Sequence, residues 1–509
     1  MSGAARRFHD ATVHTPYSVR ASGHTLDWDN KPFPFKVYTD APAVALPREI
    51  DMVATPALQA LASPGPPAGR LTLAALTALL YYAAGVTKRR TYPGGGEVLF
   101  RAAASTGALY QTEVYVVAGD VDGLEPGLYH FCPGDFMLRR LRTGDVRAAL
   151  AQAAVEPALA RRAATLVLSA IYWRNTWKYQ ARGYRHLFWD SGTMLANALG
   201  IGEALGLEPR VFTGFVDAEV NHLLGIDPER EAALELLALG PESAAATPAG
   251  PLPALAHDVM PLSSEEVDYP ALREIHQTSS LTSAAEVAPW RARPAPPSGG
   301  PRSLVALPPP ARDSRPLGEA IQRRGSTRRF NHAPLTAEEL ATALWAATLP
   351  VAVDVADGLV DLYVIVNAVE GLAPGAYAYW SGRGLELVRE GEFRREAAYL
   401  TLEQALGGDA AATIFFLAPL DAILDAWRDR GYRLVNLRAG IAGGRAYLVA
   451  YSMGFGASGL TFYDTEVAHF FAPHAAGRDA IFVTALGRAG SGRGDVLVSS
   501  VIPSPTRRS

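Results

Sequence analysis

Apolar and polar positions along the chain predict helices and strands in one order, and that order occurs twice. In the first half, a helical pattern over 71–84 precedes aromatic and β-branched residues over 114–118, which are typical of a strand. A strand over 164–171, a long helix over 186–205 and a last strand over 235–239 follow. The corresponding ranges of the second half are 336–347, 362–367, 413–417, 434–453 and 480–486. This mixture predicts an α+β fold, each half a mainly antiparallel sheet flanked by helices.

Short sequence matches relate the two halves at a nearly constant spacing. Gly123–Tyr129 is similar to Gly371–Tyr377, an offset of 248 residues, and the same offset relates Arg182-Gly-Tyr-Arg185 to Arg430-Gly-Tyr-Arg433. At an offset of 247, Asp217-Ala-Glu-Val-Asn-His222 matches Asp464-Thr-Glu-Val-Ala-His469. Ordered matches of this kind predict two copies of one domain.

We therefore divide the chain into two domains, joined and flanked by less regular segments. The ranges are an N-terminal extension over 1–39, a first domain over 40–240, a linker over 241–314, a second domain over 315–488 and a tail over 489–509. The linker is rich in Ala, Pro and Ser, which indicates a connector without its own core, with one short docked helix over 269–281. The tail is expected to be loose. Because the long helices are rich in small residues, we expect the two copies to meet there as an intrachain pseudo-dimer.

Composition narrows the classes of function. The 509 residues are 49% hydrophobic and 19% charged, as in soluble globular proteins. The formal net charge of -4 provides no global attraction for nucleic acid or an anionic membrane, and the longest apolar run, 71–86, is too short to span a bilayer. Cys132 is the only cysteine and the eleven histidines show no paired ligand spacing, so neither a disulfide framework nor a metal site is expected. We expect a cytoplasmic protein.

The two copies differ where the chemistry is expected. The second copy begins with Arg324, Ser326 and Arg328 at alternate positions, whereas the first copy has Ala60, Ala62 and Pro64 there. Two guanidiniums and a hydroxyl on one extended segment can converge on a phosphate. The alternative is a solvated basic surface patch.

The first copy has a loop before its strand that the second copy lacks. This loop contains Ser105, Gly107, Ala108 and Leu109, and the second copy is 16 residues shorter in this region. A Ser/Gly loop lets the backbone approach a planar ligand, although an ordinary turn is the alternative. At the other end Arg488 follows the last strand of the second copy, where the first copy has Pro241. The losses in the two copies are complementary.

These residues resemble the nitroreductase-like flavoproteins, whose homodimers bind FMN at the subunit interface. The resemblance implies one FMN per chain, built from both halves of a fused pair. It assigns the FMN phosphate to Arg324, Ser326, Arg328 and Arg488, the covering loop to Ser105, Gly107, Ala108 and Leu109, and a Gly-rich approach to the flavin to Gly454 and Gly456. The spacing Gly454-Phe-Gly456-Ala-Ser-Gly459 also fits a dinucleotide fingerprint, but it follows a helix instead of a strand, which disfavours a Rossmann site.

Within that family the first copy is most similar to the SagB-type dehydrogenases, which oxidise azoline rings of ribosomal peptides to azoles. The similarity lies in the loop 107–110, in Trp177-Lys178-Tyr179 and in Arg182–Arg185. It implies that Lys178 is the base, that FMN accepts the hydride, and that Tyr179 assists as an acid or orients the ring. One departure is Gln111, where the family has proline, which affects the expected pocket shape. The alternative for Lys178 is a surface lysine snorkelling from its helix.

Other functions of the same fold remain open at this point. One is an NAD(P)H-dependent nitroreductase or quinone reductase, and another is a non-catalytic subunit that binds flavin or peptide. The second copy has Trp427-Arg428 in place of the Lys-Tyr pair, so we expect one active site. The expected partners are a peptide or small heterocyclic substrate and a cyclodehydratase complex, with further homodimerisation open.

Overall fold

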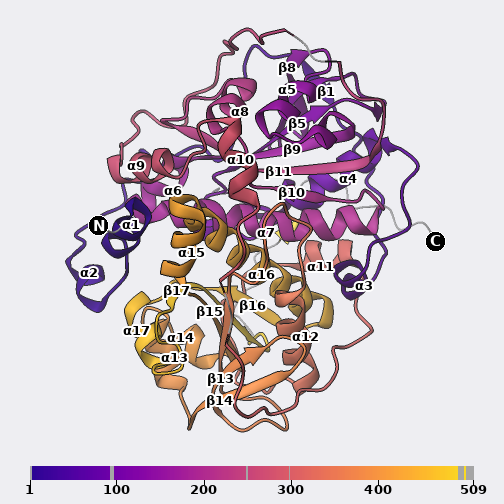
Figure 1. The fold of residues 1–509 in the computed structure, drawn as a ribbon. Helices are drawn as coiled ribbons and strands as arrows, with labels where there is room; N and C mark the ends of the chain where they lie inside the picture. The colour runs from indigo at the N-terminus through magenta and orange to yellow at the C-terminus, as the bar shows by residue number, and fades with distance from the viewer. Residues whose placement is uncertain (1–2, 92–96, 248–249, 297–298, 491–497, 500–509) are drawn as a thin grey trace.

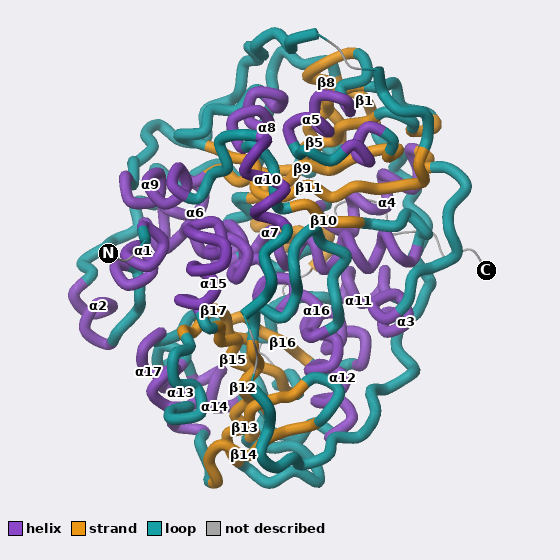
Figure 2. Tube along the Cα trace, in the orientation of Figure 1, coloured by secondary structure: helices purple, strands orange, loops and turns teal. Residues whose placement is uncertain are grey.

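Two sheets, one from each half of the chain, lie on opposite sides of a pair of long helices in the computed structural model (Figure 1). The structure describes residues 3–91, 97–247, 250–296, 299–490 and 498–499. Figure 2 shows the strands in two groups, with helices between and around them. The predicted α+β class with two tandem domains is confirmed.

The first sheet has seven strands in the order β1-β8-β7-β5-β9-β11-β10, with every neighbouring pair antiparallel. They are β1 (Ala43–Ala45), β5 (Thr112–Ala118), β7 (Gly127–Cys132), β8 (Met137–Thr143), β9 (Arg162–Ile171), β10 (Arg210–Phe212) and β11 (Glu231–Glu242). Strand β5 is buried along its whole length because both faces of the sheet are covered. Val114 and Val116 face one core and Tyr115 and Val117 face another, as the period of two along a strand requires.

The helices of the first half follow the predicted order. They are α3 (Ala57–Ala62), α4 (Leu73–Ala84), α5 (Arg147–Ala153), α6 (Tyr172–Tyr179), α7 (Gly183–Ala204) and α8 (Asp217–Leu224). Two small sheets flank this half: β2 (Leu71–Thr72) pairs with β6 (Val121–Asp122), and β3 (Val86–Thr91) pairs with β4 (Glu97–Arg101). The predicted helix over 71–84 therefore begins two residues later, because Thr72 caps it by accepting a hydrogen bond from the Ala75 N–H.

The second sheet has six strands in the order β14-β13-β12-β15-β17-β16, again all antiparallel. They are β12 (Asp361–Val366), β13 (Gly375–Trp380), β14 (Gly384–Glu390), β15 (Ala412–Ala418), β16 (Gly456–Gly459) and β17 (Asp479–Gly487). Its helices are α11 (Leu317–Arg323), α12 (Ala337–Thr348), α13 (Arg394–Leu400), α14 (Ala405–Asp409), α15 (Leu420–Trp427), α16 (Gly431–Met453) and α17 (Asp464–Phe470).

The long helices α7 and α16 cross closely and join the halves. A Cβ added to Gly192 would lie 2.7 Å from the Leu437 carbonyl oxygen, and one added to Gly440 would lie 2.5 Å from that of Trp189. Only glycine permits this approach at the crossing. The Trp189 Nε1–H donates across it to Asn436 Oδ1 at 2.8 Å. The expectation of an intrachain pseudo-dimer built on these helices is confirmed.

The repeated Arg-Gly-Tyr-Arg and Asp-x-Glu-Val motifs contact each other across the halves. Asp464 of α17 pairs with Arg182 and Arg185 at 2.9 and 2.5 Å. Asp217 of α8 pairs with Arg430 and Arg433 at 2.5 and 2.6 Å. All six side chains are buried. Each half therefore supplies a carboxylate that holds the start of the long helix of the other half, and these contacts start α7 and α16 three residues before the predicted positions.

The remaining segments pack onto the two halves. The N-terminal helices α1 (Ala4–Ala11) and α2 (Pro16–Ala21) precede and follow His14, whose N–H donates to Asp464 Oδ2. The linker contains α9 (Pro270–Thr278), near the predicted helix, and α10 (Ala284–Arg291), which was not predicted. Residues 491–497 and 500–509 of the tail lie outside the described residues, while β18 (Val498–Ser499) pairs with β3.

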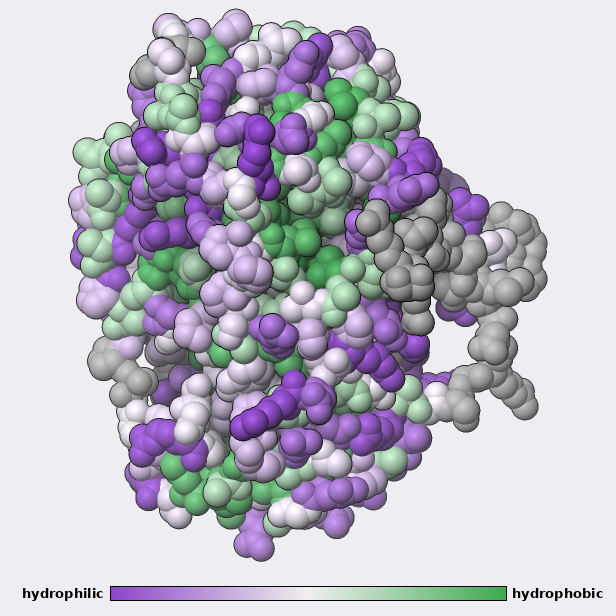
Figure 3. Space-filling model, turned by 90° about the vertical axis from the view of Figure 1, so that its right-hand side faces the viewer, coloured by the Kyte–Doolittle hydropathy of each residue, from purple (hydrophilic) through white to green (hydrophobic). Residues whose placement is uncertain are grey.

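The surface combines polar and apolar regions. Figure 3 shows one face on which hydrophilic residues surround a middle region where hydrophobic residues gather. Among the residues that the structure describes, no helix combines the length and the apolar character needed to cross a bilayer.

Candidate functional site

A cavity of about 360 Å³ lies between the two halves. The first half contributes the loop 104–108, the end of α6 and part of α7. The second half contributes Ser326, Arg328, Gln404, Tyr447 of α16, Phe482 of β17 and residues 459–461, which begin at the last residue of β16. This cavity, called the interdomain cavity below, brings together seven of the predicted site residues: Ser105, Gly107, Ala108, Lys178, Tyr179, Ser326 and Arg328.

A buried carboxylate of α7 holds the loop of the first half in place. Asp190 accepts hydrogen bonds from the Ser105 hydroxyl at 2.6 Å, from the Thr106 hydroxyl at 2.8 Å and from the Thr106 N–H. Burial raises the pKa of Asp190 to about 6, against the opposing effect of these donors. The loop is therefore fixed before any ligand binds.

Gln111, where the resemblance predicts proline, belongs to the same network. Its Nε2 donates to Asp190 Oδ2 at 2.7 Å and to the His186 carbonyl oxygen at 3.0 Å, and its Oε1 accepts from Asn175 Nδ2. Gln111 is fully buried. Gln111 thus connects the loop to both α6 and α7, which the expected proline could not do because proline has no side-chain donor.

Gly107 allows the tight approach of the loop to α6. Its φ of +67° is in the left-handed region, and a Cβ there would lie 2.9 Å from the hydroxyl oxygen of Tyr179. The Tyr179 ring also packs edge-on against the His186 ring, with centroids 4.6 Å apart. Burial raises the pKa of Tyr179, so its hydroxyl stays protonated and can donate a hydrogen bond.

The second half supplies the cationic side of the cavity. Arg328 is exposed and has no hydrogen bond or ion pair among the described residues. The Ser326 hydroxyl lies 3.4 Å from the Tyr447 hydroxyl. Arg324 is buried and donates to the carbonyl oxygens of residues 101, 102 and 103, at 2.8, 2.7 and 3.2 Å, through Nε and Nη2. Arg324 therefore fastens the base of the first-half loop and is not among the residues that line the cavity; its Nη1 makes no hydrogen bond to the described residues.

Lys178 faces the interdomain cavity near the end of α6. Its Nζ lies 5.3 Å from the centroid of the Tyr179 ring, and no hydrogen bond or ion pair to another described residue holds it. Partial burial lowers the pKa of Lys178, and the positive charges of Arg328 and Lys31 lower it further. A larger fraction of this amine is consequently neutral near pH 7 than of an ordinary lysine.

Five predicted site residues are not among those that line the cavity: Arg324, described above, and the four that follow. Leu109 belongs to a buried apolar cluster that contains Trp173 and Trp177 of α6. The Arg488 guanidinium pairs with Glu339 at 2.7 Å, beside the start of α12. Gly454 caps the C-terminus of α16 and Gly456 begins β16. Of this segment, residues 459–461 line the cavity and the two glycines do not. Their assigned roles stay predictions.

Sequence reasoning missed Asp190 and Tyr447. Asp190 is a carboxylate inside a helix of mostly apolar and small residues, which was a visible signal for a polar task in the interior. Tyr447 lies on α16, and its hydroxyl contacts both Ser326 and the Gly459 N–H. Nothing in the sequence marks Tyr447 as a site residue, because aromatic residues are common in the cores of proteins.

Comparison with known proteins gives a consistent result. A family model described as the Nitroreductase family matches residues 69–240 and 321–479. The candidate nitroreductase MJ1384 of Methanocaldococcus jannaschii is 32% identical over 171 residues, which are 33% of this chain and 81% of that protein. The microcin B17-processing protein McbC of Escherichia coli is 27% identical over 152 residues, 29% of this chain and 52% of that protein. The chain thus matches about half the length of McbC.

A solved structure is similar over both halves. The crystal structure of a candidate nitroreductase from Anabaena variabilis matches with a TM-score of 0.76 and 28% sequence identity. The match covers 96% of this chain and 100% of that one. The paired arrangement of the two halves is therefore shared with another protein.

Proposed function

The chain belongs to the nitroreductase family, and from that premise we propose that it is an FMN-dependent dehydrogenase that oxidises azoline rings of a peptide natural product to azoles. The observation that supports this best is the meeting of Lys178 and Arg328, from different halves, in one cavity. The similarity to McbC, a protein named for microcin processing, supports a peptide substrate.

The residues of the interdomain cavity suit FMN. The FMN phosphate needs cations and hydroxyl donors, which Arg328 and Ser326 offer in the cavity. Arg324 does not line the cavity, and its contact with the phosphate through Nη1 is part of the proposal. The uncompensated positive charge of Arg328 favours an anionic ligand. The loop 105–108, held by Asp190, would cover the isoalloxazine, and Arg488 is proposed as a further cation that must leave Glu339 to act.

Two groups of this chain act on the substrate in the proposed reaction. When bound, FMN supplies the two-electron acceptor for the hydride that leaves the ring CH₂. Neutral Lys178 removes the proton from the ring carbon next to the carbonyl, and the new double bond completes the aromatic ring. Tyr179, which stays protonated, donates a hydrogen bond that orients the ring.

The first experiment measures flavin content and the role of Lys178. We expect about one FMN per purified chain from the visible spectrum and chromatography of the released flavin. Lys178→Ala is expected to retain FMN and to lose about 10²- to 10⁴-fold in oxidation of a synthetic thiazoline peptide, the usual range for a general base. Lys31→Ala is the matched control: it removes a positive charge near the amine but keeps the proposed base, so it should retain oxidation apart from a small shift in the pH dependence. Unchanged oxidation in Lys178→Ala would refute the assigned role.

A reductase of the same fold is the second candidate, favoured by the relatives named as nitroreductases. It predicts rapid bleaching of the flavin by NADH or NADPH with turnover of a nitroarene or quinone, and no effect of Lys178→Ala. A non-catalytic subunit predicts bound flavin or peptide and no turnover in either assay. The azoline function also requires an enzyme that closes the ring by loss of water, so we propose a cyclodehydratase as the partner that supplies the substrate.

A further inference from the structure

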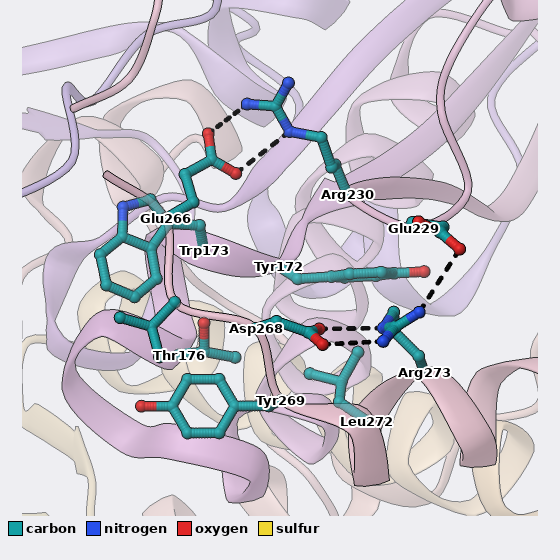
Figure 4. A pocket seen from close by; sticks show the side chains of 11 residues that line it. Tyr172, Trp173, Thr176, Glu229, Arg230, Glu266, Asp268, Tyr269, Leu272 and Arg273 are labelled. Atoms are coloured by element: carbon teal, nitrogen blue, oxygen red, sulfur yellow. Dashed lines mark hydrogen bonds and ion pairs between the residues drawn. The ribbon is translucent and has the colours of Figure 1, made fainter. Parts of the chain in front are cut away.

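A second hollow lies beside α6, away from the interdomain cavity, and the linker forms its outer wall (Figure 4). Its volume is about 350 Å³. Tyr172, Trp173 and Thr176 of α6 line it, and at 100° per residue they share one face of the helix while Lys178 is on the opposite face. We call this hollow, with its neighbour described below, the linker groove.

Aromatic rings form the inner surface of the linker groove. The polar atoms of two of them already have partners: the Tyr172 hydroxyl donates to the Pro228 carbonyl oxygen at 3.2 Å, and Trp173 Nε1–H donates to Ser263 Oγ at 2.8 Å. The half-buried Tyr269, from the linker, makes no hydrogen bond through its hydroxyl among the described residues, and Figure 4 shows its ring on the far side of the hollow from Arg230. The rings thus present apolar faces to a ligand.

Ion pairs form the rim of the groove and leave an excess of negative charge. Arg230 binds Glu266 through two contacts, and Arg273 binds Asp268 at 2.9 and 2.7 Å (Figure 4). Glu229 is exposed and only 3.4 Å from Arg273, which already has a carboxylate partner. Glu229 is therefore the carboxylate most available to a new cation.

A neighbouring hollow extends the groove. It has a volume of about 260 Å³, shares Arg230 and Glu266 with the first, and is lined by the apolar linker residues 259–262. Across the two hollows five carboxylates face three cationic side chains. An elongated apolar groove with excess negative charge complements a peptide that carries both apolar and basic side chains.

We propose that the linker groove binds a second segment of the substrate polypeptide, with an aromatic or aliphatic side chain among Tyr172, Trp173 and Tyr269 and a basic side chain at Glu229. This inference rests on the proposed function only in that the same polypeptide presents its ring at Lys178. A helix with its side chains is about 10–12 Å wide, and an extended peptide advances about 3.3 Å per residue. About five residues between ring and anchor therefore suffice to pass around α6.

Binding is tested without any turnover. The probe is a fluorescein-labelled, Gly/Ser-rich peptide of about ten residues with one Phe and one Arg, and its partner probe has Glu in place of Arg. We expect the basic probe to bind at least about tenfold more tightly by fluorescence anisotropy, and Tyr269→Ala to weaken it by about tenfold. Glu229→Lys is expected to reverse the preference between the probes. Tyr17→Ala, at an exposed aromatic residue of α2, is the matched control and should change neither.

Equal binding of both probes, or wild-type affinity in both Tyr269→Ala and Glu229→Lys, would overturn the proposal. Circular dichroism of each variant identifies any that fails to fold. Because Glu229 is exposed to solvent, Glu229→Lys is the variant that should disturb folding least. In turnover, KM for a long azoline peptide should rise in these variants while kcat and the KM of a single-ring substrate stay unchanged. If azoline oxidation is absent but the basic probe binds as expected, the groove proposal stands and the proposed function fails.

Discussion

The interdomain cavity has a smaller counterpart at the equivalent place of the other half, and the two differ in what a ligand would meet. The counterpart, of about 210 Å³, is lined by residues 60–64 and by Leu199, where the interdomain cavity has Ser326, Arg328 and Tyr447. Its one arginine, Arg445, donates to the carbonyl oxygens of Leu349 and Pro350. The counterpart therefore offers an anionic ligand no free cation from the residues that line it.

Equivalent positions on the two long helices carry opposite charges, and each side chain contacts the loop next to it. Asp190 of α7 accepts the donors of the Ser105 loop, whereas Arg438, which is 248 residues later on α16, pairs with Asp357. The Asp217 and Asp464 clusters, by contrast, are built alike in both halves. Both buried clusters are present because loss of one partner of a buried ion pair leaves an uncompensated charge.

The largest expected effect comes from breaking the shared clusters. Asp217→Ala and Asp464→Ala should each lower the free energy of unfolding by about 3–5 kcal/mol, because each leaves two buried guanidiniums unpaired. Urea denaturation of both variants measures this. A loss below about 1 kcal/mol in one variant alone would show that the clusters are not equivalent.

Asp190 should make stability depend on pH in a way that Arg438 does not. The folded-state pKa of Asp190 is about 6, above the ordinary 3.8, so the folded protein binds the proton more tightly. Stability from this group is then fully present below about pH 4 and falls by up to about 3 kcal/mol as pH rises through 6. Asp190→Asn should remove this decline and Arg438→Gln should keep it, as measured by denaturation between pH 4 and 7. An unchanged decline in Asp190→Asn contradicts the assignment.

Arg328 should matter for flavin retention and its counterpart Pro64 should not. Loss of a charge-assisted hydrogen bond costs about 1.5–3 kcal/mol, so Arg328→Ala should weaken FMN binding by about 10- to 150-fold in titrations of the apoprotein. Arg329→Ala, at the exposed neighbouring residue, is the control. Pro64→Arg should not add a second FMN, because a Cβ at Gly65 would already lie 2.5 Å from the Glu203 carbonyl oxygen and the segment has no room to open. Two FMN per chain in Pro64→Arg would contradict this.

The smallest expected effect concerns the pKa of Lys178. Because the Lys31 charge lowers that pKa, Lys31→Gln should raise it. The proposed base is active when neutral, so oxidation should increase as pH rises through this pKa, and the acidic limb of the rate profile should move to higher pH by a few tenths of a unit. A shift to lower pH would exclude Lys178 as the group that titrates.

The tandem fold was predictable because the sequence of the domain recurs in the second half of the chain. The Arg-Gly-Tyr-Arg motifs and the small-residue helices recur at a fixed offset, and their partners are buried ion pairs and close helix contacts that tolerate little change. The boundaries were less predictable: α10 was missed, since its pattern is short and interrupted by Pro289. Such short helices form where tertiary contacts support them.

Some features of the candidate site could also be predicted from the sequence, and others could not. Complementary losses in the two copies pointed to a composite cavity, and Ser105, Lys178 and Arg328 do line one cavity. The roles of Asp190, Gln111 and Arg324 depend on which carbonyl or hydroxyl lies within about 3 Å, and no spacing along the chain encodes that. The resemblance assigned Arg488 and Leu109 to the flavin site. In the structure Arg488 pairs with Glu339, and Leu109 belongs to an apolar cluster.

The sequence by itself determined the fold class, the duplication and the asymmetry between the copies, because these follow from periodicity and from residue types compared at equivalent positions. Only the tertiary structure decided which of the cations are free, how the loop 105–108 is held, and that the linker lines a groove beside α6. The physical reason is that a hydrogen bond, an ion pair and a cavity depend on distances of a few ångströms between segments far apart in the chain.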